Sequence, residues 1–113
     1  MSNFMFVFRG GETPTSPEAM QAQMQKWMTW MGSLNEQGKF VSAQPLAESG
    51  KTITGNKKIV SDGPFMEGKE MVGGYLICKA TDYPEALEIS KGCPILEFDD
   101  GVVEVREIQE LSM

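Results

Sequence analysis

The sequence predicts a single α+β domain in which two helices cover one face of a mostly antiparallel sheet. Three observations lead to this fold class. Short apolar runs rich in aromatic and β-branched residues indicate strands, two well-capped segments indicate helices, and the order is strand, helix, strand, hairpin, strand, helix, strand. A length of 113 residues is enough for one domain with one modest core.

The first third of the chain is expected to form one strand and one long helix. Phe4–Phe8 is too short for a helix, is apolar on both faces and is ended by an Arg-Gly-Gly segment, as in a buried strand. Ser16 as N-cap and Pro17 at the first helical position start a helix over residues 17–37. Gly38 suits the left-handed conformation that commonly ends a helix.

This helix carries apolar residues three and four positions apart, which predicts one apolar stripe along it. The stripe consists of Met20, Met24, Trp27, Met28, Met31 and Leu34. The favoured interpretation is a helix side that faces the core. The alternative is an adaptable binding surface, since methionine side chains are flexible and polarizable.

The remaining elements follow from turn and cap signals. They are a strand over Phe40–Leu46, a hairpin within Lys51–Val60, a strand over Met71–Lys79, a helix from Asp82 to near Gly92 and a strand over Gly101–Ile108. Gly55-Asn56 is typical of a two-residue hairpin turn, and Asp62-Gly63-Pro64 is expected to turn the chain. Asp82 with Glu85 three residues later resembles a capping box.

This β-α-β-(hairpin)-β-α-β order is the ferredoxin-like plan. Two helices cover only one face of such a sheet, yet Phe4–Phe8 is apolar on both faces. The same holds for Met71–Lys79, where Tyr75 and Ile77 alternate with Leu76 and Cys78. Something else must therefore cover the second face, and a second copy of the chain is the simplest cover. We expect a homodimer.

Composition excludes several classes of function. A formal net charge of −6, with Lys57-Lys58 as the sole adjacent basic pair, argues against a nucleic-acid partner. No apolar run approaches the roughly 20 residues of a membrane span, and the N-terminal run is too short for a signal-peptide core. We expect a cytoplasmic protein without a membrane partner.

Metal and cofactor sites are not expected. The chain has no histidine, which removes histidine-based general bases and histidine-containing zinc sites. Cys78 and Cys93 form no CxxC pair, and Cys78 lies in an apolar run where a buried thiol is the simplest interpretation. Asp62, Glu67 and Glu70 could at most offer oxygen ligands to a hard cation, without the spacing of a known calcium loop.

Residues 62–70 read Asp-Gly-Pro-Phe-Met-Glu-Gly-Lys-Glu and are followed by Gly73-Gly74-Tyr75. This segment resembles the YCII-related family, specifically the branch named for the DGPF motif, and the resemblance extends over nearly the whole chain. It implies a ferredoxin-like subunit that dimerises face to face into an α+β barrel. It also implies two functional classes, because members are proposed to be small-molecule enzymes while DGPF relatives often accompany sigma factors.

The resemblance fails at the acid/base dyad proposed for other members. They carry a histidine on the first helix and an aspartate after the second. Counting from Gly38 and from Pro94, these positions hold Trp27 and Cys93 in this chain. The dyad cannot be carried over.

The candidate site is the polar segment beside the diglycine. Asp62, Glu67 and Glu70 are the candidate catalytic acids or bases. The candidate ligand-binding residues are Lys69, Gly73, Gly74 and Tyr75, with the lysine orienting an anionic molecule and the glycines allowing close approach. A structural interpretation is favoured, in which Asp62 caps a turn and the charged residues form a solvated loop. The functional alternatives are a small-molecule enzyme or binding protein and a regulatory or assembly domain.

Overall fold

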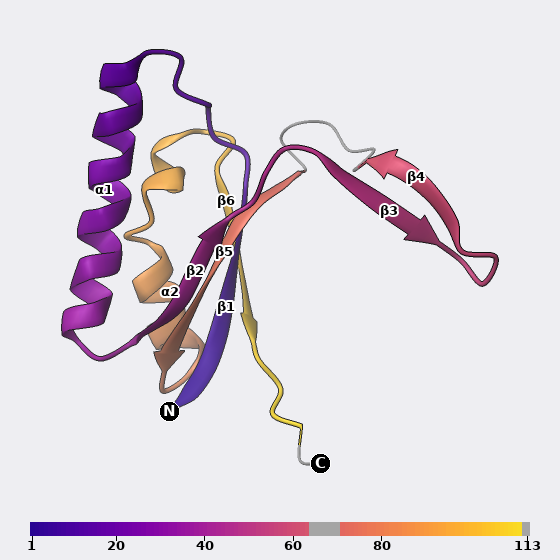
Figure 1. Cartoon of the computed structure of the whole chain (residues 1–113). Helices are drawn as coiled ribbons and strands as arrows, with labels where there is room; N and C mark the ends of the chain where they lie inside the picture. The colour runs from indigo at the N-terminus through magenta and orange to yellow at the C-terminus, as the bar shows by residue number, and fades with distance from the viewer. Residues whose placement is uncertain (64–70, 112–113) are drawn as a thin grey trace.

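The computed structural model describes residues 1–63 and 71–111, in which two helices pack on one face of a four-stranded antiparallel sheet and a hairpin stands apart (Figure 1). The elements are β1 (Ser2–Arg9), α1 (Pro17–Glu36), β2 (Phe40–Pro45), β3 (Gly50–Thr54), β4 (Ile59–Gly63), β5 (Val72–Ala80), α2 (Tyr83–Ser90), the 3₁₀ helix η2 (Pro94–Glu97) and β6 (Val102–Glu107). The predicted α+β class and element order are confirmed.

The four-stranded sheet has the order β2-β5-β1-β6, with every neighbouring pair antiparallel. The two central strands are the ones whose sequences are apolar on both faces. Phe6 in β1 lies opposite Leu76 in β5 and Val105 in β6. This strand order is consistent with the ferredoxin-like plan.

Side-chain alternation divides the central strands between two faces of the sheet. Phe4, Phe6 and Phe8 of β1 are buried and face the helices, together with Leu76 and Cys78 of β5. Leu34 of α1 and Ala86 of α2 close this core from the helix side. The expected two-sided apolar strands are confirmed.

The opposite face of the sheet, here named the open face, has an apolar centre made by Met5 and Val7 of β1 and Tyr75 and Ile77 of β5. All four residues are half-buried, and both helices lie on the other side of the sheet. The salt bridge between Arg9 and Glu104, 2.7 Å long, lies beside this centre.

Both helix starts form as their cap residues predict. Ser16 Oγ accepts a hydrogen bond of 3.1 Å from the amide of Ala19, and Asp82 Oδ1 accepts one of 2.9 Å from the amide of Glu85. Gly38, with φ of 72°, follows the end of α1. These signals are local in sequence, so local chemistry is enough to place them.

The expected core-facing stripe of α1 is only partly correct. Trp27, Met31 and Leu34 pack on the core, whereas Met20, Met24 and Met28 are exposed. At about 100° per residue, Met24 and Met28 lie about 40° and 80° around the helix from Met20, progressively off the side of Trp27 and Met31, whereas Met20 lies on that side about two turns before Trp27. The three exposed methionines, Met20, Met24 and Met28, are here named the methionine row.

The hairpin β3–β4 confirms the predicted hairpin but corrects its turn. Thr54 pairs with Ile59, so the loop is Gly55–Lys58, four residues long rather than two. Gly55 and Lys58 both have positive φ there. Of the expected turn at Asp62-Gly63-Pro64, Asp62 and Gly63 instead extend β4, because they pair with Lys51 and Gly50, and Pro64 lies outside the described residues.

Candidate functional site

The candidate site is an apolar cleft of about 460 Å³ between α1, the end of β2 and the start of β5. Trp27 and Met31 of α1 line one side, and Phe8 of β1 and Ile95 of η2 line another. The start of β5 contributes the Gly73-Gly74 pair. The cleft therefore lies at the end of the sheet where β1 and β2 finish and β5 begins.

Trp27 is held in the cleft wall by other aromatic rings. Its ring centroid lies 5.0 Å from that of Phe8 and 5.8 Å from that of Trp30, both in edge-to-face geometry. Trp30 is anchored in turn, because its indole nitrogen donates a 3.2 Å hydrogen bond to the carbonyl of Ile89. The packed core therefore fixes the position of the Trp27 ring.

The two glycines of the diglycine differ in what surrounds them. A Cβ on Gly74 would lie 2.9 Å from the carbonyl oxygen of Gln44 and 3.2 Å from Cα of Pro45, so close pairing of β5 with β2 requires glycine there. A Cβ on Gly73 would meet nothing nearer than the carbonyl oxygen of Phe8 at 3.9 Å. The close approach expected at the diglycine is thus made by a neighbouring strand at Gly74.

The structure brings three of the sequence-predicted site residues together. Gly73, Gly74 and Tyr75 all line the cleft. Asp62 does not line it: its side chain is 88% exposed, forms a 2.6 Å ion pair with Lys51 and borders a separate depression on the hairpin. Such an exposed pair is strongly screened by water. Glu67, Lys69 and Glu70 lie outside the described residues.

The sequence profile of the YCII-related domain matches residues 4–112. The chain belongs to the YCII-related domain family. The predicted resemblance to this family is therefore confirmed. No curated protein matches the chain in sequence.

The two positions of the dyad proposed for other YCII-related members lie in different surroundings in this protein. Trp27 lines the apolar cleft, while Cys93 borders a groove of about 720 Å³ between α1 and the segment around η2. Burial raises the pKa of Cys93 to about 12, against a smaller opposing effect of its hydrogen bond with the backbone of Ile95. A protonated, buried thiol is a poor nucleophile at neutral pH.

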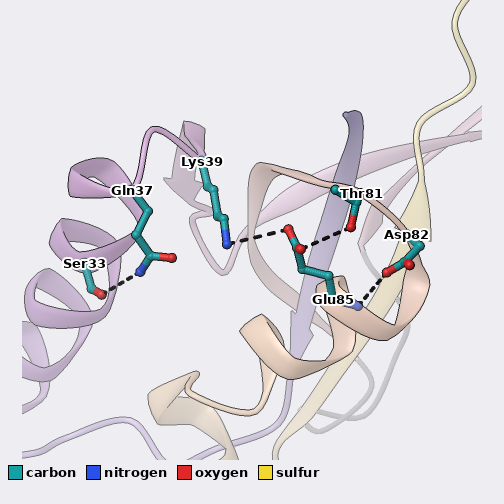
Figure 2. Close-up of polar contacts among 6 residues, drawn as sticks. All are labelled: Ser33, Gln37, Lys39, Thr81, Asp82 and Glu85. Atoms are coloured by element: carbon teal, nitrogen blue, oxygen red, sulfur yellow. Dashed lines mark hydrogen bonds and ion pairs between the residues drawn. The ribbon is translucent and has the colours of Figure 1, made fainter.

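A polar cluster lies at the other end of the sheet, where α1 ends and α2 begins (Figure 2). Lys39 Nζ lies 3.6 Å from Glu85 Oε1, and Thr81 Oγ1 donates a 3.1 Å hydrogen bond to the other carboxylate oxygen. Glu85 Oε1 is buried without a hydrogen-bond partner among the described residues. The cluster joins the start of β2 to the start of α2, and we interpret it as structural.

The same cluster acts on the thiol of Cys78 in β5. Burial raises the pKa of Cys78 to about 11, with Lys39 lowering it and Glu85 raising it to smaller extents. Cys78 therefore remains a protonated core residue at neutral pH, as its apolar run predicts.

The described residues contain neither a metal-ligand cluster nor a membrane-spanning helix. Within residues 1–63 and 71–111, no three His, Cys, Asp or Glu side chains come together in a way that could hold a metal ion. Neither α1 nor α2 is long and apolar enough to cross a membrane, and no other helix of the described ranges is.

Sequence reasoning missed most of the cleft. Phe8, Met31 and Ile95 come from three elements, and only the tertiary fold brings them together. The one available signal was the methionine and tryptophan content of α1, which had suggested an adaptable binding surface as the alternative to core packing.

Proposed function

We propose that this YCII-related protein binds a small molecule with a flat, largely apolar body in the cleft beside Gly73. The supporting observation is the lining: two aromatic rings, Trp27 and Phe8, with methionine and isoleucine side chains around a space of about 460 Å³. Small-molecule sites typically occupy roughly 300–1,000 Å³ and are mostly apolar.

Binding is favoured over acid/base catalysis for the described part of the site. Among the described lining residues, Tyr75 is the one of titratable type, and alternation along β5 places its side chain on the open face, so its backbone contributes to the lining. Because Asp62 does not line the cleft, an anionic substrate or a proton-transfer step would need groups such as Lys69, Glu67 or Glu70, which lie outside the described residues. That version of the site remains a proposal.

A ligand screen tests the cleft directly. Planar aromatic compounds, each in neutral and carboxylate forms, are tested by thermal shift and by tryptophan fluorescence, to which Trp27 and Trp30 both contribute. A ligand at about 100 times its Kd adds about 2.7 kcal/mol to stability, which such a screen detects. A preference for the carboxylate forms would indicate a cation at the site and so support a role for Lys69.

Met24 and Met28 provide a matched pair for that screen. They are 64% and 63% exposed on the same helix, but only Met24 is among the cleft lining. Met24→Ser should weaken binding of a screened ligand several-fold, whereas Met28→Ser should leave it unchanged. Equal effects of the two variants would place the ligand outside the cleft.

The alternative function is a regulatory or assembly domain, for example one associated with sigma-factor-type transcription regulation. The methionine row supports it, because flexible exposed methionines suit a protein-binding surface. In that case Met28→Ser should weaken binding to the partner protein while small-molecule binding in the cleft stays intact.

We also propose that the protein belongs to the DGPF branch of the family and that it is cytoplasmic. The Asp62-Gly63-Pro64-Phe65 sequence supports assignment to the DGPF branch. Cys78 and Cys93 are both free thiols, which suits the reducing cytoplasm.

A homodimer formed through the open face is the proposed assembly. Met5, Val7, Tyr75 and Ile77 give this face an apolar centre, and Arg9 with Glu104 adds a polar rim. Interfaces commonly combine such a centre with such a rim. A two-fold axis would place the same four side chains of a second copy against them.

A further inference from the structure

The hairpin β3–β4 packs chiefly on itself. All five residues of β3 are exposed, including Ile53 at 67%, and Val60 of β4 is 60% exposed. Ile53 and Val60 are direct cross-strand partners and share a face of the hairpin with Lys51 and Asp62. Thr54 and Ile59 form a pair on the opposite face.

Among the residues that the structure describes, the hairpin lacks the packing that normally stabilises such an element. An isolated two-stranded hairpin is marginal in water at best and requires a further strand or a packed surface. The apolar Ile53–Val60 pair gains nothing from remaining in solvent. The sequence nevertheless places β-branched residues there, as expected of a strand pair that is covered.

The direction in which the hairpin extends indicates where the surface that packs against it lies. Figure 1 shows it projecting from one end of the sheet, on the side away from α1. The radius of gyration is 15.8 Å. A compact chain of this length would have about 13 Å. The hairpin thus extends beyond the body of its own subunit, on the side where a second copy is proposed to bind.

Charge also favours a second copy as the partner. The segment Gly50–Gly63 contains three lysines and one aspartate, whereas the chain as a whole has a formal net charge of −6. The hairpin is a basic extension of an acidic protein, so the body of another copy is an electrostatically complementary surface for it.

We propose that β3–β4 is an exchanged arm: each subunit of the homodimer lays the Ile53–Val60 face of its hairpin on the body of the other. This inference rests on the proposed homodimer and adds a second contact to it, separate from the open face. By two-fold symmetry, both arms are exchanged at once.

The test compares substitutions on the two faces of the arm in the full-length protein. Ile53→Thr with Val60→Thr keeps β-branched side chains but replaces one apolar branch of each with a hydroxyl, and Ile59→Thr makes the same change on the opposite face. Sedimentation velocity should show a dimer Kd weakened at least about tenfold by the double variant, and within about twofold of wild type for Ile59→Thr.

A second measurement identifies the chain on which the arm lies. Dimers are formed from mixed ¹⁴N- and ¹⁵N-labelled copies and treated with a carbodiimide, which joins lysines to carboxylates in contact. Crosslinks from Lys57 or Lys58 to a carboxylate of the other isotope are expected. A monomeric wild type would overturn both the dimer and the arm. A dimer with unchanged Kd in the double variant, or with crosslinks within one isotope only, would overturn the arm alone.

Discussion

Trp27 excludes acid/base chemistry at its own position and supplies an aromatic surface to the cleft. Its indole takes no part in proton transfer near neutral pH, and its ring packs on Phe8 and Trp30 while lining the cleft. Trp27→Ala should lower the free energy of unfolding by about 3 kcal/mol, and Trp27→Phe by less than about 1.5 kcal/mol. Urea unfolding checks both values, and equal effects would mean that the volume of the ring does not matter.

The two buried cysteines predict a stability loss at alkaline pH. Burial raises the pKa of Cys78 to about 11 and of Cys93 to about 12, from 9.0. Above pH 9 the unfolded state releases these protons first, so stability is complete below that pH and declines as pH rises toward the folded pKa values. Urea melts between pH 8 and pH 11 should slope downward, and less steeply for Cys78→Ala. Identical slopes for wild type and Cys78→Ala would contradict burial of Cys78 as a cause of the stability loss.

At the scale of elements, Gly73 serves as a control for Gly74, because the two neighbouring glycines have different surroundings. Gly74→Ala forces a Cβ against the backbone of β2, so it should destabilise the protein by about 1–3 kcal/mol. Gly73→Ala has open space and should change stability by less than about 1 kcal/mol. Thermal unfolding of the two variants separates these cases. A larger stability loss for Gly73→Ala than for Gly74→Ala would show that close pairing of β5 with β2 does not explain why glycine occupies these positions.

How much of each helix and strand the sequence could predict depends on how far along the chain its signal acts. Ser16, Gly38 and Asp82 act on atoms a few residues away, so their effects were predictable. The exposure of Met28 depends on where the sheet lies relative to α1, which no local pattern contains. The hairpin loop has four residues rather than two, with Lys58 at positive φ, and a Gly-Asn signal does not indicate this.

At the scale of the whole molecule, the fold was more predictable than the site. Apolar residues on both faces of β1 and β5 indicated that these two strands are central in the sheet, which limited the topology strongly. The cleft arises from elements that meet only after folding, so the sequence found Gly73 and Tyr75 but not Phe8 or Ile95.

The proposed open-face dimer can be broken by charge. Val7→Lys with Ile77→Lys places two like charges per subunit at the centre of the face, so the variant should elute as a monomer at micromolar concentration. Met28→Lys, on the helix side of the sheet, should remain a dimer. Size-exclusion chromatography with light scattering distinguishes the two. A dimer that survives the double variant would have to use another surface.

The methionine row has a consequence for oxidative conditions. Exposed thioethers react with peroxide first, and a sulfoxide is polar where the methionine was apolar. Met20, Met24 and Met28 are exposed, so they should be oxidised before Met31, which packs on the core. Because Met24 also lines the cleft, mild oxidation would make one edge of a binding site polar without unfolding the subunit. Ligand affinity in this protein would then vary with redox conditions and recover when methionine sulfoxide reductase restores the thioether.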